Sequence, residues 1–212
     1  MEEDDEASKV IPRWVELEYK HMRDLAGPNS QVHFTHLSEA SCNALRTLFK
    51  PENSAEPEKE KAEISVHTEG VLDLMKSMDV PLEKVCLLDP KAPDALSPED
   101  GDGRFEWFLF GGILGDDPPR DRTSELRVLG FPTRHLGPIQ MTTDTALGVT
   151  KLVVENKIPL KDIPHVDYPT FVFNQRESVE MPFRYIVEDG QPKLPPGMRE
   201  HLQEDLNKSF DF

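Results

Sequence analysis

Apolar residues in the first fifty positions recur with the spacing of two helices and a strand between them. From residue 8 to residue 26 they recur at helical spacing, which predicts a helix that the Gly-Pro pair at 27–28 ends, with Ile11, Trp14, Val15, Met22 and Leu25 inward. Val32 and Phe34 alternate with polar neighbours, as in a short strand. Ser38 is placed to cap a second helix that runs to residue 49.

The middle of the chain alternates between strand-like and helical segments. The pattern predicts strands over 63–67, 85–88 and 107–110, and helices over 69–78, from 123 onward and over 146–157. We expect the helix over 69–78 to bury Val71, Leu72 and Met75, and the helix from 123 onward to bury Leu126 and Leu129. The polar runs 51–62 and 91–104 are interpreted as loops, the first of them mobile and acidic. This order predicts an α/β fold with a mostly parallel sheet and helices on both faces.

Three loops that are expected to end near one place in the parallel sheet carry the residues most suited to chemistry: 88–90, 111–117 and 136–143. The ends of parallel strands lie at one edge of a sheet, where α/β proteins bind ligands. Gly111, Gly112 and Gly115 allow a ligand to approach the backbone, and the third loop enters a helix N-terminus that favours a polar group. The glycine pair would look the same in a simple tight turn, because the loop matches neither the GxGxxG nor the P-loop pattern.

Composition narrows the class of partner. The 24 basic and 40 acidic residues give a net charge of −16, which disfavours a nucleic-acid substrate and favours a basic partner. Cys42 and Cys86 are too few for a disulfide framework or a cysteine zinc site, and His33 and His36 lack a third metal ligand at suitable spacing. With neither a long apolar run nor a signal peptide, we expect a cytoplasmic protein without a membrane anchor or a metal.

Five strings carry a resemblance to a known family: VCLLDPKAP, FLFGGILGDDPPRDRTSELR, QMTTDTA, IPHVDYPTF and VEMPFRY. They resemble the SPOUT-class protein arginine methyltransferases, a eukaryotic family that methylates an arginine of a small-subunit ribosomal protein. The resemblance runs from about residue 13 to residue 198. It implies an α/β sheet with a deep C-terminal trefoil knot, a SPOUT domain over 1–163, and an extension over 164–212 that completes the substrate cleft. It also implies a monomer.

The resemblance assigns the three loops to S-adenosylmethionine. The residues expected to bind this cofactor are Leu88, Gly111, Gly112, Ile113, Leu114, Gly115, Leu136, Gln140, Met141, Thr142 and Thr143. The apolar members would enclose the adenine, and the glycines would lie along the ribose and the methionine part. Thr142 and Thr143 have a second interpretation, since a threonine at this place also caps a helix.

Methylation of arginine needs a carboxylate, because the guanidinium group stays protonated and is a poor nucleophile. Asp116, which follows the glycines, is the first candidate to grip the guanidinium and accept its proton, and Asp121 is the second. Asp121 lies between two arginines and could instead brace the loop. Asp117, Glu177 and Glu180 are expected to bind the substrate, although the two glutamates could also lie in a solvated loop.

Other residues are given a simpler interpretation. Asp144 is interpreted as part of a helix cap, and Tyr19, Tyr168 and Tyr185 as residues at the edge of the core. The alternative functions are a SPOUT methyltransferase that acts on RNA, and an inactive module that binds a ribosomal protein.

Family members begin with an apolar strand ahead of the segment that matches residues 1–3. Without such a strand inside the sheet, we expect an open apolar groove with unpaired backbone groups.

Overall fold

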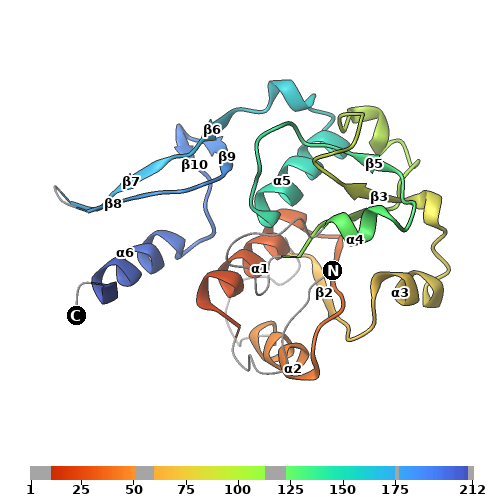
Figure 1. Ribbon diagram of the computed structural model, residues 1–212, viewed down its shortest axis with the longest axis horizontal. Coiled ribbons are helices and arrows are strands. Elements are labelled where there is room, and N and C mark those ends of the chain that lie inside the picture. The colour runs from red at the N-terminus through yellow and green to blue at the C-terminus, as the bar shows by residue number, and fades with distance from the viewer. Residues whose placement is uncertain (1–10, 51–59, 113–122, 175–176, 210–212) are drawn as a thin grey trace.

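The computed structural model describes residues 11–50, 60–112, 123–174 and 177–209. Figure 1 shows a body of helices and short strands, from which the C-terminal part extends to one side. The helices are α1 (Arg13–Ala26), α2 (Glu39–Leu48), α3 (Val71–Ser77), α4 (Thr123–Arg127), α5 (Thr143–Val154) and α6 (Met198–Ser209). The strands are β1 (Gln31–Phe34), β2 (Glu63–Val66), β3 (Val85–Leu88), β4 (Trp107–Leu109), β5 (Thr133–Arg134), β6 (His165–Asp167), β7 (Thr170–Val172), β8 (Ser178–Glu180), β9 (Arg184–Glu188) and β10 (Gln191–Pro192).

The centre of the body is a parallel sheet of order β4-β3-β5. All four residues of β3 are buried, as expected for a strand that is covered on both faces. Cys86 and Leu88 pack with α5, whereas Val85 and Leu87 pack with α3 and α4. Helices therefore cover both faces of this sheet, and the predicted strands at 85–88 and 107–110 are confirmed to within one residue.

A second parallel pair, β1 with β2, contributes the other half of the body. Phe34 of β1 is buried against Tyr19 of α1, with their ring centroids 4.2 Å apart, and the same cluster includes Leu45 of α2. Ser38 caps α2 as predicted, since its side chain accepts a hydrogen bond from the Ser41 amide. The predicted strands near 32–34 and 63–67 and the helix after Ser38 are confirmed.

A groove of about 550 Å³ lies between β1 and β4. Residues 31–35 line one side and residues 106–112 the other, and β1 and β4 are not paired with each other. Apolar side chains close the groove from both faces of the sheet, among them Met22 and Leu147 on one face and Leu74 on the other.

Two predicted core positions are wrong. On α3 (Val71–Ser77), Val71, Leu74 and Met75 share the buried face because they are three and four positions apart, while Leu72 lies off that face and is 44% exposed. α4 ends at Arg127, which leaves Leu129 beyond the helix and 37% exposed. In both cases the helix is shorter than the apolar pattern suggested. Leu126, by contrast, is fully buried as predicted.

Helix boundaries also differ at two further places. The helix predicted over 146–157 begins at Thr143 and ends at Val154, with Thr142 as its N-cap. The polar loop 91–104 contains a short 3₁₀ turn, Pro98–Gly101, which Ser97 and Asp100 close with a reciprocal capping box. The predicted start of the first helix, residues 8–10, and most of the predicted loop 51–62 lie outside the described residues.

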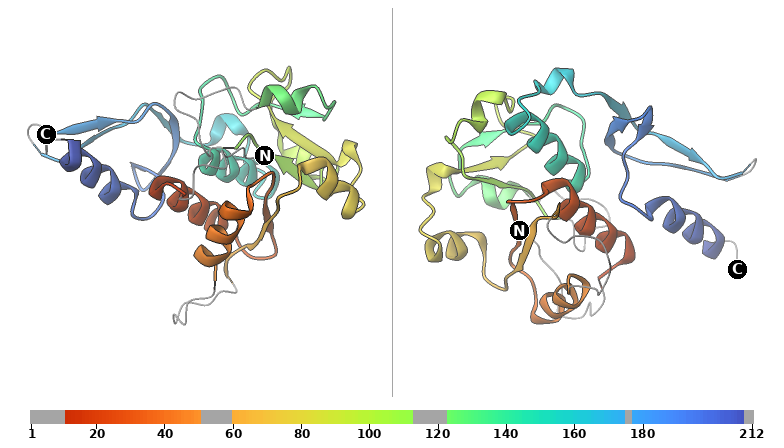
Figure 2. Two further views of the ribbon diagram at one scale, coloured as in Figure 1. Left: turned by 60° about the horizontal axis from the view of Figure 1, so that its bottom comes forward. Right: turned by 180° about the vertical axis from the view of Figure 1, so that it is seen from behind.

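The C-terminal part combines short antiparallel strands with α6. β9 is the middle strand of the sheet β10-β9-β6, and β7 and β8 form a separate hairpin. Figures 1 and 2 show the hairpin and α6 extending away from the body in every view. The guanidinium of Arg199 on α6 lies 5.7 Å from the ring centroids of both Phe171 and Phe173, so the two elements are held together by cation–π contacts. These strands were not predicted.

None of the helices in the described part of the chain is both long and apolar enough to span a membrane.

Candidate functional site

The three loops predicted to converge do meet, as far as they are described. β4, β3 and β5 are parallel neighbours, so their C-terminal ends, at Leu109, Leu88 and Arg134, face one edge of the sheet. Gly111 and Leu136 lie two positions beyond the ends of β4 and β5. The hydroxyl of Thr143, in the first turn of α5, donates to the Gly111 carbonyl at 3.4 Å. This contact places the loop after β4 against the N-terminus of α5. Ile113, Leu114, Gly115, Asp116, Asp117 and Asp121 lie outside the described residues.

The described candidates offer both apolar and polar surface at this edge. Leu88 is 7% exposed, and Leu136 and Met141 are half-buried against the same core cluster. Gly111 and Gly112 are half-buried and carry no side chain that would cover their backbone groups. Gln140 is exposed. These residues fit a ligand that has a flat apolar part and polar ends.

Thr142 and Thr143 have different roles. Thr142 occupies the N-cap position, but its side chain makes no capping bond and instead donates to the Thr145 hydroxyl at 2.8 Å. The first-turn amides of α5 therefore receive no side-chain cap, and the positive end of the helix dipole faces the site. Thr143 is the threonine that reaches across to β4.

A buried ion pair holds the ends of two of the loops. Asp89, which follows β3, is 2% exposed and accepts from Arg127 Nε at 2.5 Å and Arg127 Nη2 at 2.7 Å. It also accepts from the Lys91 amide at 2.9 Å, and Arg127 donates to the Thr123 hydroxyl at 3.3 Å. The turn after β3 and the start of α4 are thereby fixed to each other.

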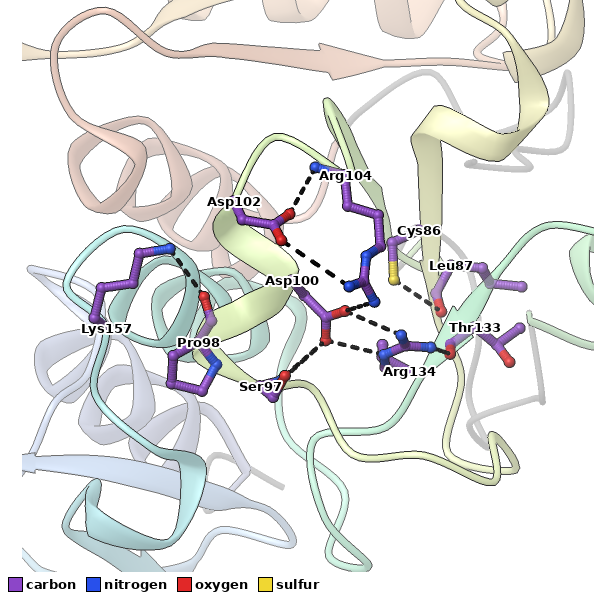
Figure 3. A network of polar contacts seen from close by, with 10 residues as sticks. All are labelled: Cys86, Leu87, Ser97, Pro98, Asp100, Asp102, Arg104, Thr133, Arg134 and Lys157. Atoms are coloured by element: carbon purple, nitrogen blue, oxygen red, sulfur yellow. Dashed lines mark hydrogen bonds and ion pairs between the residues drawn. The ribbon is translucent and has the colours of Figure 1, made fainter.

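A second network, drawn in Figure 3, fixes β5. Asp100 is 1% exposed and binds the Arg134 guanidinium through two hydrogen bonds of 2.9 and 3.0 Å, while Arg104 approaches to 3.6 Å. Cys86 lies beside this network, and its burial raises the pKa of its thiol to about 12. The thiol is therefore protonated at neutral pH and unsuited to act as a nucleophile.

β9 joins the C-terminal part to the third loop. The Arg184 amide donates to the Gln140 carbonyl at 2.9 Å, and the Arg184 side chain binds both carboxylate oxygens of Asp167 at 2.6 and 2.9 Å. Glu177 and Glu180 belong to the β7–β8 hairpin, the first half-buried and the second exposed, and the hairpin extends away from the body (Figure 2). Of the C-terminal part, Arg184 contacts the third loop, and a substrate role for the two glutamates stays a prediction.

Beneath the third loop lies a polar cluster that sequence reasoning missed. Asp144 is fully buried, and its Oδ2 lies 2.7 Å from His21 Nδ1 on α1. Glu18 and Tyr185 are buried near it, at 6% and 1% exposure. The pKa of Tyr185 is raised, first by burial and then by the negative charges of Glu18 and Asp144. We call these four residues the buried polar cluster.

The structure corrects three of the simpler interpretations, those of Asp144, Tyr19 and Tyr185. Asp144 does not cap α5, because its side chain is directed to α1. Tyr19 and Tyr185 are fully buried rather than at the edge of the core, and Tyr168 is 50% exposed. One signal was available in the sequence: Glu18 lies three positions after Val15, so a carboxylate falls on the buried face of α1.

Within the described residues, no group of three or more His, Cys, Asp or Glu side chains is arranged to hold a metal ion. His33 contacts His67, with Nδ1 and Nε2 3.2 Å apart, and stacks on Trp107.

Comparison with known proteins places the chain in a family. Residues 1–209 match the family model of SFM1-like protein arginine N-methyltransferases. The chain belongs to this family. The protein arginine N-methyltransferase SFM1 of Saccharomyces cerevisiae is 50% identical over 133 residues, which are 60% of this chain and 62% of SFM1. The chain thus aligns with about three fifths of the length of that relative.

Solved structures of the SFM1-like family share the fold. The crystal structure of the yeast arginine methyltransferase SFM1 complexed with SAM has a TM-score of 0.77 and 35% identity, over 96% of this chain and 88% of that one. A structure described as a novel protein arginine methyltransferase has a TM-score of 0.75 and 34% identity, over 97% of both chains. The mixed α/β architecture with parallel strands is therefore that of SFM1.

Proposed function

We propose that this protein transfers a methyl group from S-adenosylmethionine to an arginine side chain of a basic small-subunit ribosomal protein. Membership of the SFM1-like family supports the reaction, and the related yeast enzyme is described in complex with SAM. The observation that carries the proposal is the Thr143–Gly111 contact, which brings the ends of the parallel strands and the N-terminus of α5 to one point.

The described residues fit this cofactor. Leu88, Leu136 and Met141 would enclose the adenine, and Gly111 and Gly112 would allow the ribose and methionine parts to lie along the backbone. The uncapped amides of α5 would hold a polar end of the ligand. When bound, the cofactor supplies a methyl group on a positively charged sulfur. Ile113, Leu114 and Gly115 complete the proposed binding set.

On the protein side, the reaction requires a carboxylate that orients the target guanidinium and takes its proton. We assign this proton to a carboxylate oxygen of Asp116, with Asp121 as the alternative. Because the guanidinium is delocalised, alignment by the protein contributes much of the acceleration.

The proposal extends to architecture and partner. We propose that the loops at Gly111 and Gln140–Thr143 belong to a deep trefoil knot of the SPOUT type, which the contact between these sequence-distant loops supports. The net charge of −16 supports a basic protein as the substrate. The proposal includes that the enzyme is a monomer and works in the cytoplasm. Residues 164–212, with Asp117, Glu177 and Glu180, would provide the substrate cleft.

Labelled S-adenosylmethionine tests the proposal directly. The protein is incubated with separated small-subunit ribosomal proteins and, in parallel, with ribosomal RNA, and the labelled molecule is identified by mass spectrometry. Methylarginine in a ribosomal protein is the expected product. Label in RNA would replace the proposal with an RNA methyltransferase, and binding of a ribosomal protein without transfer would replace it with an inactive binding module.

A further inference from the structure

The third loop of the candidate site, residues 136–143, is supported by one residue of the C-terminal part. Arg184 is the first residue of β9, and its amide donates to the Gln140 carbonyl at 2.9 Å. Met141 and Arg184 also form an isolated parallel β-bridge. The backbone of Arg184 therefore holds the end of the loop that leads into α5.

The side chain of Arg184 lies at the other end of the same loop. A methyl group added to Gly137 would come within 3.7 Å of Arg184 Nη1, so the guanidinium lies beside this glycine. Gly137 has a φ of +105°, a conformation that residues with side chains rarely adopt, and its amide donates to His135 Nδ1 at 3.0 Å. Arg184 thus reaches both the tight turn that opens the loop and the backbone that closes it.

Asp167 fixes the direction of this guanidinium. Asp167 of β6 and Arg184 are partners in the antiparallel ladder, and the carboxylate accepts from Nε at 2.6 Å and from Nη2 at 2.9 Å. The hydrogen bonds from Arg184 lower the pKa of Asp167, so the carboxylate stays ionised at neutral pH. A two-bond pair of this kind holds the guanidinium in one plane, with Nη1, which Asp167 does not bind, beside Gly137.

The position of the pair, more than its strength, relates it to the cofactor. The side chains of Arg184 and Asp167 are 21% and 35% exposed, and ion pairs of such exposure add little to the free energy of unfolding. Leu136 directly precedes Gly137, and Met141 forms the bridge with Arg184. These two apolar residues are proposed to enclose the adenine, so a shift at either end of the loop would displace one of them.

We propose that Arg184 is a positioning residue for the cofactor: with Asp167 as its anchor, it holds residues 136–141 in the conformation that binds S-adenosylmethionine. Its guanidinium acts on the loop and not on the reacting atoms. This inference rests on the proposed function and assigns the support of one cofactor loop to the C-terminal part of the chain.

The variant that tests this role is Arg184→Met, which removes the guanidinium but keeps a long side chain and the backbone bond to Gln140. If the loop then adopts its binding conformation about a tenth of the time, the Kd for S-adenosylhomocysteine in calorimetry should rise about tenfold. The melting temperature of the cofactor-free protein should fall by less than about 4 °C, because the pair is partly exposed. Asp167→Asn should change both quantities in the same directions.

The matched control is Lys193→Met. Lys193 is also paired in this sheet, at 2.8 Å from the carboxylate of Glu188 at the end of β9. Its replacement should leave the Kd for S-adenosylhomocysteine unchanged. An unchanged Kd in Arg184→Met, or an equal rise in Lys193→Met, would overturn the inference, since the effect would then be absent or general to the sheet.

Hydrogen exchange of the cofactor-free protein separates positioning of the loop from direct contact with the ligand. The amides of the loop, that of Gly137 among them, should exchange about tenfold faster in Arg184→Met than in the wild type, while those of β3 keep their rates. Weaker binding without faster exchange in the loop would mean that the guanidinium binds the ligand itself, and the positioning role would be wrong. Failure of the proposed function has a different signature, because the wild-type protein itself would then bind no S-adenosylhomocysteine.

Discussion

We predict how much the ion pair between Asp89 and Arg127 contributes to the free energy of unfolding, because this contribution depends on burial. Asp89 is 2% exposed and accepts two hydrogen bonds from the guanidinium and one from the Lys91 amide. Asp89→Asn keeps the shape of the side chain but removes its charge and turns an N–H donor toward the donors of Arg127. We expect the free energy of unfolding to fall, because a largely buried guanidinium loses its counter-charge.

The size of the loss follows from the exposure of the two partners. Breaking a fully buried pair costs about 3–5 kcal/mol, and the Arg127 side chain is 29% exposed, so we expect about 2–3 kcal/mol. For a chain of this size, that corresponds to a drop in melting temperature of roughly 4–12 °C. The control is Asp167→Asn. Asp167 also accepts two hydrogen bonds from one guanidinium, that of Arg184, but the Asp167 side chain is 35% exposed. There the cost should stay below about 1 kcal/mol.

Urea denaturation, followed by the fluorescence of Trp14 and Trp107, measures both losses on the same protein. The reasoning requires the two variants to differ. If Asp167→Asn costs as much as Asp89→Asn, burial does not set the strength of these pairs, and the anchoring role given to Asp89 is wrong.

Three further predictions concern the site and the response to pH. Gly112→Val should abolish binding of S-adenosylhomocysteine in calorimetry, because a branched side chain would fill ligand space, and unchanged affinity would make the glycine pair a simple turn. Asp116→Asn should keep cofactor binding and lower kcat by roughly 10²–10⁴, whereas Asp121→Asn should weaken cofactor and substrate binding together. Both variants are measured by steady-state kinetics at saturating cofactor, and exchanged results would mean that the two aspartates have the opposite roles. Burial and the charge of His67 lower the pKa of His33 below 6.5. The unfolded chain therefore binds protons more readily, and the free energy of unfolding should fall as the pH drops below 6.5. His33→Gln should reduce this fall between about pH 7.5 and about pH 5.5 in denaturation experiments, and an equal fall in the variant would exclude His33 as its source.

Strands β1 to β4 of the body could be predicted because each is marked by its own residues, whereas β5 is only two residues long and was not predicted. Val85–Leu88 is apolar throughout, and Val32 and Phe34 alternate with polar neighbours, so local pattern and burial agree. The C-terminal strands could not be predicted, because segments such as Ser178–Glu180 are short, mostly exposed and paired only within a hairpin. The ends of α3 and α4 were misjudged because apolar residues continue past the last helical turn.

The candidate site was predicted as a set of loops but not as a set of contacts. Glycines and threonines at strand ends indicated where a ligand would bind, and the Thr143–Gly111 contact agrees with that. The buried polar cluster was missed because its members are far apart in the sequence: His21 and Asp144 are separated by 123 positions. Each of these residues has an ordinary local interpretation, and only the packing of α1 on α5 brings them together.

Because the body is split into two sheets, the buried polar cluster lies where the two halves are joined. β1–β2 and β4-β3-β5 share no ladder in the described residues, so α1, which leads into β1, and α5, which covers β3, connect the two halves. The His21–Asp144 contact and the Lys151 hydrogen bond to the Ala26 carbonyl lie on this seam. Loss of the His21–Asp144 contact would loosen the seam, and the amides of β1 and β2 would then exchange their hydrogens faster with solvent.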